Sequence, residues 1–375
     1  MAKNIKKLPA VRFFSKVSKH TGYGQASKNF IITLSDSDIR AKMDIRGASR
    51  AIGRPVSSYK GNAGIDIYLH CPPYDKHISK NYKIGYFYWE ADKLPRQWRR
   101  SIHRLDEIWA PCELVRSACK RIGFKGPIEI VPTPSTFGIP EKNVGIPSLI
   151  SEEYLVSKDV FKFYSIFQWH ERKGFKELLK AYLSEFSKKD RVMLILKVMP
   201  LGVGKYNREN IRIDILNLKR RLNLKEYPLI YLIDETLPLE DVYALHKYSD
   251  CYVSAHHGEG WGIPIHDAML AGNHLITTKF GGITEYLDEN SAHIIKHTMN
   301  KVKNMGWSKL YNDDQNWAYP SISHLKGLMR NVYENSKAHM DKTYSAKKIA
   351  ESMSTDSVGK IIEDILSNKR FSKFI

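Results

Sequence analysis

Short apolar runs alternate with longer amphipathic segments along the first part of the chain. The runs VRFFSKV, IDIYLH, KIGYFYW and IEIVP have the length of strands and lie at residues 11–17, 65–70, 83–89 and 128–132. The segments RQWRRSIHRL and LVRSACKRIGF, at residues 96–105 and 114–124, have a helical pattern. Alternation of this kind predicts a parallel sheet covered by helices.

The same alternation begins again after a stretch rich in proline at residues 132–147, which is typical of a linker or long loop. The strands predicted there lie at 161–168, 191–198, 228–234, 251–256 and 274–279, and the helices at 173–186, 209–224 and 239–249. A chain of 375 residues is longer than one core usually organises. We therefore predict two doubly wound α/β domains, at residues 1–155 and 156–354, and an amphipathic helix at about 355–375 that packs back on the first.

The segment from His256 to Leu287 carries the most chemistry, HHGEGWGIPIHDAMLAGNHLITTKFGGITEYL. A strand ends there in a glycine-rich loop that holds Glu259, and a helix follows with Pro264 and Asp267 in its expected first turn. A second glycine pair, Gly281–Gly282, opens another helix. Helix-start amides attract anions and carboxylates accept from hydroxyl groups, so the segment suits a ligand with phosphates and a sugar. The structural alternative is that Asp267 is an acidic helix cap.

This segment resembles the donor-binding signature of retaining GT-B glycosyltransferases of the glycogen-synthase-like, family-four class. The resemblance implies the GT-B architecture: two Rossmann-like doubly wound parallel-sheet domains that face each other across a cleft. It also implies that Glu259 lies near the donor sugar and Asp267, in place of the usual Glu, near the ribose. The donor-binding residues implied here are Gly258, Glu259, Gly260, Trp261 in place of the usual Phe, Gly262, Ile263, Pro264, Asp267 and Gly282.

A second stretch, Ser165–Tyr182, resembles the part of the same family in which an arginine and a Lys-Gly pair clamp the diphosphate. Lys173 followed by a glycine fits the pair. The family arginine would fall on Gln168, so Arg172 is the candidate to replace it. Without the resemblance, two cations before a helix would be read as solvated surface.

The turn TGYG, with Gly22 and Gly24, follows the first strand. The resemblance implies that its backbone approaches the donor closely, which glycine permits. The same residues also read as a degenerate GxGxxG, with Ser27 in place of the third glycine and Asp44 twenty residues after Gly24. A dinucleotide-dependent oxidoreductase is therefore the rival enzyme hypothesis.

The segment YFYWEADKLPRQW, at residues 86–98, resembles the part of the first domain that borders the cleft in this class. Glu90 follows its apolar strand and is a candidate for contact with sugar or acceptor, although a solvated strand end explains it equally well. His70 ends the neighbouring run and is a weaker candidate of the same kind. The predicted catalytic residues are thus Glu259, Lys173 and Glu90.

The positive charge of the chain is concentrated in its first part. Residues 1–150 hold 26 Lys and Arg against 12 Asp and Glu, a net of +14, whereas the remainder holds 33 against 28, a net of +5. Solubility alone can explain this excess of positive charge, but the excess also indicates an acidic partner. We therefore expect a polyanionic acceptor, with DNA that carries hydroxylated bases as the leading hypothesis. A lipid-linked or cell-surface saccharide, with peripheral membrane contact, and a basic nucleic-acid-binding protein without enzymatic activity remain the alternatives.

The remaining features limit the cofactors and the compartment. The apolar runs are too short to cross a bilayer, no secretory pattern follows the basic start, and the four cysteines form no CxxC pair. These features favour a cytoplasmic protein with free thiols. No DxD stands where a metal-dependent glycosyltransferase would need it, so we expect metal-independent transfer with a nucleotide sugar as co-substrate and no further cofactor. The resemblance implies front-face attack with retention, Lys173 stabilising the departing diphosphate. The sequence favours no oligomeric state.

Overall fold

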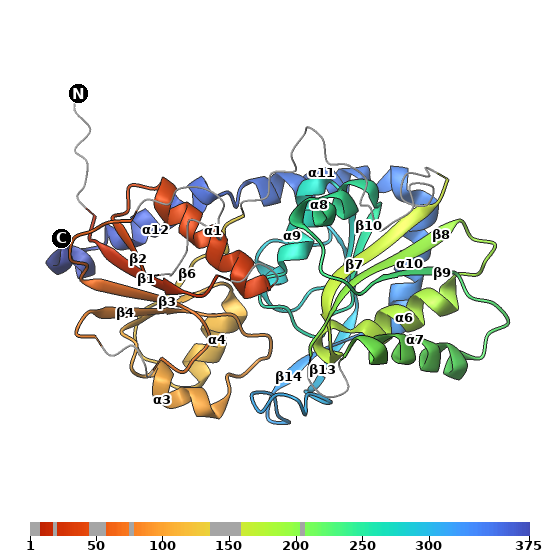
Figure 1. Ribbon diagram of the computed structural model, residues 1–375, viewed down its shortest axis with the longest axis horizontal. Helices are drawn as coiled ribbons and strands as arrows, with labels where there is room; N and C mark the ends of the chain where they lie inside the picture. Colours follow the sequence, from red (N-terminus) through yellow and green to blue (C-terminus); the bar gives the residue numbers. More distant parts are fainter. Residues whose placement is uncertain (1–7, 18–20, 45–57, 75–78, 136–158, 203–206) are drawn as a thin grey trace. The chain divides into compact units, whose positions relative to one another are not determined.

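The computed structural model describes residues 8–17, 21–44, 58–74, 79–135, 159–202 and 207–375. The chain divides into two compact units, Met1–Thr136 with Ser352–Ile375 and Phe137–Glu351 (Figure 1). The predicted boundary between residues 155 and 156 lies outside the described residues. Each unit contains a sheet of six strands, and every neighbouring pair described in the two sheets is parallel. The predicted fold class, two α/β units with parallel sheets, is therefore confirmed.

The sheet of the first unit has the order β2-β1-β3-β4-β5-β6. Its strands are β1 Val11–Ser15, β2 Ala41–Asp44, β3 Ile65–Leu69, β4 Tyr82–Tyr86, β5 Glu107–Ala110 and β6 Ile128–Ile130. Its helices are α1 Gly22–Asp36, α4 Glu113–Arg121 and α12 Thr355–Leu366, with the short turns η1 Arg96–Trp98, α3 Arg99–Ile102 and η5 Lys369–Phe374. The strand expected at 83–89 ends at Tyr86, because the amide of Tyr88 donates to the Tyr23 hydroxyl instead of to a neighbouring strand (2.9 Å).

The last helix returns to the first unit. α12 packs along α1, and Phe371, in η5, is fully buried against the Tyr82 ring. The guanidinium of Arg370 donates to both oxygens of Glu107, at 3.0 and 3.1 Å, and to Glu129 at 2.7 Å. The side chain of Glu107 is fully buried, so this contact balances a charge inside the unit.

The sheet of the second unit has the order β12-β11-β10-β7-β8-β9. Its strands are β7 Phe161–Trp169, β8 Val192–Pro200, β9 Leu229–Ile233, β10 Cys251–Ser254, β11 His274–Thr278 and β12 His293–Ile295. The helices are α6 Phe175–Glu185, α7 Arg208–Leu222, α8 Leu239–Tyr248, α9 Ile263–Ala271, α10 Ile322–Asn335 and α11 Met340–Glu351, with the turns η2 Glu171–Lys173, η3 Gly282–Glu285 and η4 Ser336–His339. An antiparallel pair, β13 His297–Lys301 and β14 Asn316–Pro320, is separate from the sheet.

Helices cover both faces of this second sheet. On one face, Leu194, Leu196 and Val198 of β8 join a buried cluster with side chains of α6, α7 and α10. On the other face, the Tyr164 hydroxyl lies 2.6 Å from Nδ1 of His246 in α8. Phe163, the neighbour of Tyr164 in β7, lies in the buried cluster on the first face, so alternate residues of β7 point to opposite helical layers, as a doubly wound unit requires.

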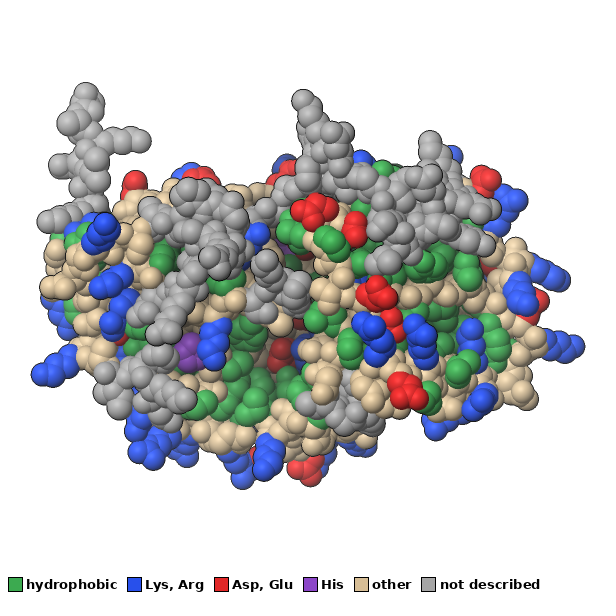
Figure 2. All heavy atoms as spheres, in the orientation of Figure 1, with side chains coloured by type: hydrophobic (Ala, Val, Ile, Leu, Met, Phe, Trp, Pro, Cys, Tyr) green, Lys and Arg blue, Asp and Glu red, His purple; other side chains and the backbone are tan. Residues whose placement is uncertain are grey.

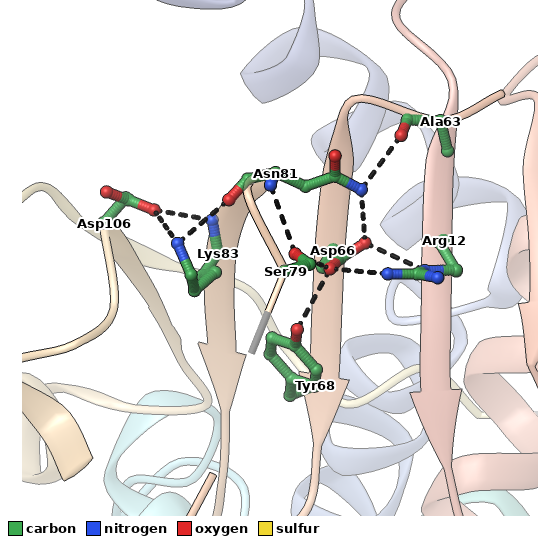
Figure 3. Close-up of polar contacts among 8 residues, drawn as sticks. All are labelled: Arg12, Ala63, Asp66, Tyr68, Ser79, Asn81, Lys83 and Asp106. Carbon is green, nitrogen blue, oxygen red and sulfur yellow. Dashed lines mark hydrogen bonds and ion pairs between the residues drawn. The ribbon is translucent and has the colours of Figure 1, made fainter. Parts of the chain in front are cut away.

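A buried carboxylate joins the amino ends of β1, β3 and the segment before β4 (Figure 3). Asp66 accepts two hydrogen bonds from Arg12, at 3.0 and 2.9 Å, and others from Tyr68, Ser79 and Asn81. Burial raises the pKa of Asp66, but these donors and the Arg12 charge outweigh burial and lower it. The charge is fully balanced within the unit, so this cluster is structural.

Candidate functional site

Three loops meet at the carboxyl edge of the second sheet. They follow β7, β10 and β11, three adjacent parallel strands, whose carboxyl ends must share one edge. The carbonyl of Arg172 accepts from the amide of His257 at 2.8 Å, and that of Glu259 accepts from the amide of Gly282 at 2.8 Å. These backbone bonds hold the β10 loop between the other two.

Two glycines let the loops approach this closely. Gly174 has a φ of 64°, and a Cβ there would lie 1.7 Å from the carbonyl oxygen of Ala255. Gly281 has a φ of 99°, and its Cβ would lie 2.0 Å from the carbonyl oxygen of Glu259. Any side chain would therefore push the loops apart. Gly282, the predicted donor-binding residue beside Gly281, is confined in the same way. A Cβ there would lie 2.4 Å from the carbonyl oxygen of Gly260.

Glu259 forms an ion pair with Lys173, and the Arg172 guanidinium lies 3.9 Å from the same carboxylate oxygen. Arg172 also donates to the carbonyl of Gly258 at 2.8 Å. Burial raises the pKa of Glu259, but the charges of Lys173 and Arg172 overcome it and lower the pKa to about 2. The two predicted cations and the predicted acid are therefore together. Gln168, at the position of the family arginine, is exposed one residue before the end of β7.

His256 lies beneath this ion pair as a neutral donor and acceptor. Burial lowers its pKa to about 3. Its Nδ1 lies 2.9 Å from the Ser254 hydroxyl, and its Nε2 lies 3.2 Å from the carbonyl oxygen of Phe280. Because a carbonyl only accepts, Nε2 carries the proton and Nδ1 accepts from the serine. His256 thus links the β10 and β11 loops without adding a charge.

Asp267 lies one turn further along the helix than the sequence suggested. α9 begins at Ile263 after Gly262, which has a φ of 90°, so Asp267 is its fifth residue and lies in the second turn. The cap interpretation is therefore wrong. Its half-buried carboxyl makes no hydrogen bond or ion pair with the residues that the structure describes, and burial raises its pKa well above the usual range. A carboxyl in this state can form hydrogen bonds with ligand hydroxyls.

The start of α9 offers fewer amide donors than a helix usually does. The amides of Ile265 and His266 donate to the carbonyl of Gly262, at 2.8 and 3.0 Å. Pro264 has no N–H, so Ile263 supplies the remaining first-turn amide. The cations Lys173 and Arg172, more than this helix, are therefore the groups suited to an anion.

Trp261 points into the unit and away from solvent. It is 3% exposed and packs against the Tyr286 ring at 5.0 Å, and its carbonyl accepts from the Tyr286 hydroxyl at 2.5 Å. The indole therefore supports the loop around Glu259, and its part in donor binding stays a prediction.

The predicted residues of the first unit lie at the carboxyl edge of its own sheet. Gly22 and Gly24 form the first turn of α1, where the amide of Gly24 donates to the capping Thr21 side chain at 3.0 Å. Glu90 is half-buried after β4. Burial raises the pKa of Tyr23, and the charge of Glu90 adds to that rise. His70 follows β3, with Nδ1 2.9 Å from the carbonyl of Cys71.

Ser27, which stands in place of the third glycine of the rival GxGxxG pattern, has a structural role. This residue is buried within α1, where its hydroxyl donates to the carbonyl of Tyr23 at 2.8 Å and lies 2.5 Å from the Ser15 hydroxyl. It joins the helix to the end of β1. Asp44, the acidic residue of that pattern, is the last residue of β2.

Lys197 is a charged residue that the sequence prediction did not single out. It is 5% exposed in β8, and burial lowers its pKa to about 8 while Asp234 opposes the shift. Its ammonium makes no hydrogen bond with the described residues. The signal was present in the sequence, because RVMLILKV places one lysine inside an otherwise apolar strand.

The described residues hold no cluster of metal ligands, no helix able to span a membrane and no disulfide. These residues contain no group of three or more His, Cys, Asp and Glu side chains that could hold a metal ion. None of their helices combines the length and apolarity that crossing a bilayer requires. All four cysteines are free, and Cys112, Cys119 and Cys251 are buried.

The comparisons with known proteins agree with this geometry. Residues 158–304 match the family described as glycosyl transferases group 1, and this range contains the whole loop cluster. No curated protein matches the chain. Among solved structures, Anabaena HepE in complex with UDP and glucose is similar over 96% of this chain and 100% of its own, with a TM-score of 0.68 and 14% identity.

Two further similar structures are trehalose-phosphate synthases. The Escherichia coli enzyme bound to UDP-2-fluoro glucose covers 81% of this chain and 73% of its own, with a TM-score of 0.62 and 14% identity. That of Burkholderia xenovorans, in complex with glucose-6-phosphate, covers 81% and 74%, with a TM-score of 0.61 and 13% identity. The chain therefore has the predicted GT-B fold, and residues 158–304 are similar to the glycosyl transferases group 1 family.

Proposed function

We propose that the chain is a retaining glycosyltransferase of the family-four class that transfers a sugar from a nucleotide sugar to an acceptor hydroxyl. The observation that carries the proposal is the cluster of Lys173, Arg172 and Glu259 on loops held together by glycines. It lies inside the range that matches the glycosyl transferases group 1 family. The similar structures named with UDP and glucose support a UDP-hexose as the first donor to test.

In this proposal the two cations exchange partners when the donor binds. Lys173 and Arg172 turn from Glu259 to the diphosphate, where charged hydrogen bonds are each worth roughly 1.5–3 kcal/mol. Glu259, already ionised, then accepts from hydroxyls of the donor sugar. Asp267 accepts from the ribose, which supplies the hydrogen bonds that its carboxyl lacks. The donor half thus needs no metal ion to neutralise the diphosphate.

Transfer proceeds by attack on the face from which the diphosphate leaves. The acceptor oxygen forms its bond to the anomeric carbon as the bond from that carbon to the diphosphate oxygen breaks. The acceptor proton passes to the departing phosphate oxygen, and Lys173 with Arg172 stabilises the charge that develops there. This route retains the anomeric configuration and requires no covalent intermediate. Glu90 is the candidate for contact with the acceptor or the sugar, and Gly22 and Gly24 of α1 are the glycines proposed to approach the donor.

The acceptor proposed is a polyanion, and DNA with hydroxylated bases is the leading candidate in a cytoplasmic setting. The net charge of +14 over residues 1–150, against +5 over the rest, supports this choice. A lipid-linked or cell-surface saccharide is the competing acceptor, and the same basic residues would then rest on anionic headgroups.

The donor part of the proposal is tested by calorimetry and by slow hydrolysis of a panel of nucleotide sugars. We expect one of them to bind and to be hydrolysed equally well with and without EDTA. Activity that EDTA abolishes and manganese restores would count against the proposed metal independence. Absence of binding by every nucleotide sugar would overturn the donor assignment itself.

A further inference from the structure

Five basic side chains lie along one side of a single helical stretch in the first unit. They occur at spacings of zero, three, four, seven and eight residues, which places them on one helical face: Arg96, Arg99, Arg100, His103 and Arg104. All five are exposed and, with Gln97, line an open hollow of about 570 Å³. On the opposite side, Trp98 and Ile102 are buried. We call these five residues the arginine face.

The neighbouring helix α4 extends this surface. Nε2 of His103 lies 3.3 Å from the carbonyl oxygen of Ile122, so the end of the arginine face contacts the end of α4. Arg116, Lys120 and Lys125 line a second open hollow there, of about 360 Å³. In Figure 2, Lys and Arg side chains gather along the lower left edge, where Figure 1 draws α3.

Acidic residues are few in this part of the sequence. Residues 93–125 contain nine Lys and Arg against three Asp and Glu. Of the three acids, Glu107 is buried and bound by Arg370, and Glu113 pairs with Arg116. Arg99 and Arg100 form no ion pair with the residues that the structure describes. Like charges at these helical spacings repel each other and destabilise a helix, and an anionic partner would relieve this repulsion.

We propose that the arginine face binds the phosphate backbone of duplex nucleic acid. Guanidinium groups match phosphate oxygens in pairs, and several along one face can follow successive phosphates. Backbone contacts of this kind position a protein on the duplex without reading its sequence.

The composition of the surface distinguishes this partner from two others. Residues 93–125 expose no large hydrophobic side chain, whereas a helix that lies in a membrane surface inserts such side chains. They also expose no Phe, Tyr or Trp ring, whereas proteins that bind single strands stack bases on aromatic rings. Charge without exposed large apolar side chains or exposed Phe, Tyr and Trp rings therefore favours a duplex over a bilayer or a single strand.

The test compares two charge-matched double variants in the full chain. R99Q/R100Q removes two charges from the arginine face, and K188Q/K189Q removes two from exposed lysines of the second unit. Binding of a labelled DNA duplex is followed by fluorescence anisotropy across a salt series. We expect R99Q/R100Q to weaken binding at least tenfold and to flatten the salt slope by about 2, roughly 0.9 for each phosphate that the variant no longer neutralises. The lysine variant should stay within about twofold of the original chain.

Three outcomes would overturn the inference. The unchanged chain could fail to bind duplex near physiological salt, or both variants could lose affinity equally, which would indicate net charge without a defined surface. Alternatively, R99Q/R100Q could lose binding to phosphatidylserine vesicles and keep binding to duplex, which would indicate a membrane partner.

The inference rests on the proposed function only in taking the bound duplex as the acceptor. Duplex binding is measured without donor, and nucleotide-sugar binding is measured without duplex. A chain that binds duplex through Arg99 and Arg100 but binds no nucleotide sugar would sink the proposed function and leave this inference standing. A chain that binds a nucleotide sugar but does not bind duplex through Arg99 and Arg100 would overturn this inference and leave the proposed function standing.

Discussion

The two sheets have the same number of parallel strands but very different carboxyl edges. In the second unit, charged side chains meet between glycines, with Lys173 and Arg172 around Glu259. In the first unit, Glu90 lies at this edge beside neutral groups: the Tyr23 hydroxyl lies 2.9 Å from the Cys71 sulfur and accepts from the Tyr88 amide at the same distance. The second unit thus concentrates charge at its edge, whereas the first carries charge on outer helices. One scaffold can therefore present a compact anion site or a broad basic surface.

The units also differ in how they bury histidine. In the second unit His246, His256, His266, His274 and His293 all have pKa values that burial lowers to about 3 or 4. Among the described residues of the first unit, no histidine is buried to this degree. This difference gives the two units different expected responses to acid.

The largest effect expected is loss of the second unit in mild acid. Below about pH 6.5 the unfolded chain binds protons that the buried histidines of the folded unit do not, so stability is constant above that pH and falls as pH drops toward 4. Each such histidine contributes up to about 1.4 kcal/mol per pH unit, and five together amount to several kcal/mol by pH 5.5. Hydrogen exchange measured by mass spectrometry at pH 7.5, 6.5 and 5.5 resolves the two units. Equal loss of protection in both would contradict the comparison.

Removal of the central ion pair should affect catalysis next most strongly. We expect Glu259→Gln and Lys173→Met each to lower transfer or donor hydrolysis by two to three decades, the scale for one preorganised electrostatic contact. Lys188→Met, an exposed lysine outside the loops, is the control and should keep its rate. Thermal melting confirms that the variants fold. Rates near the original value in folded variants would show that the site is elsewhere.

The close approach of the loops is tested by Gly174→Ala. Its positive φ and the collision with the Ala255 carbonyl should lower the free energy of unfolding by about 3 kcal/mol. Gly272→Ala is the matched control, since Gly272 has a φ of 79° and no atom within 4 Å of its added Cβ, so we expect about 1 kcal/mol. Urea unfolding measures both. Equal costs would mean that loop contact adds nothing at Gly174.

The smallest effect expected concerns Asp267. Because ribose contacts are made equally in the ground state and the transition state, Asp267→Asn should raise the KM for the donor about tenfold and leave kcat nearly unchanged. Initial rates over a range of donor concentrations separate the two constants. A fall in kcat with an unchanged KM would instead place Asp267 at the reacting carbon.

Periodicity predicted the elements that are long or strongly apolar. Strands β7, β8 and β11 lie within a residue or two of their predicted ranges. β2 was missed because Ala41–Asp44 has only four residues, two of them charged, and its pairing with β1 is a long-range contact. The β13–β14 pair was missed for a similar reason, since its exposed first strand has no apolar run.

The donor cluster was predictable because its key residues lie in two contiguous segments that adjacent strands bring together. Asp267 was assigned to the wrong turn, because the sequence does not show that Gly262 ends the loop and starts α9 at Ile263. The arginine face was not singled out, since a basic helical stripe reads as solvated surface until its acidic neighbours are known. Glu107 lies close to the arginine face in sequence, but only the fold shows that Glu107 already forms an ion pair with Arg370.

The contact between Arg370 and Glu107 also has a consequence for the order of synthesis. A ribosome makes β1 to β6 first, yet the cation that balances the buried Glu107 and the helix that covers α1 come after every residue of the second unit. The first unit is therefore begun first and completed last, while the second can fold as soon as its own residues emerge. A nascent chain that stops before residue 352 would hold a finished second unit and an uncovered first one. Chaperones that bind exposed apolar surface would accordingly meet the amino-terminal half of the chain.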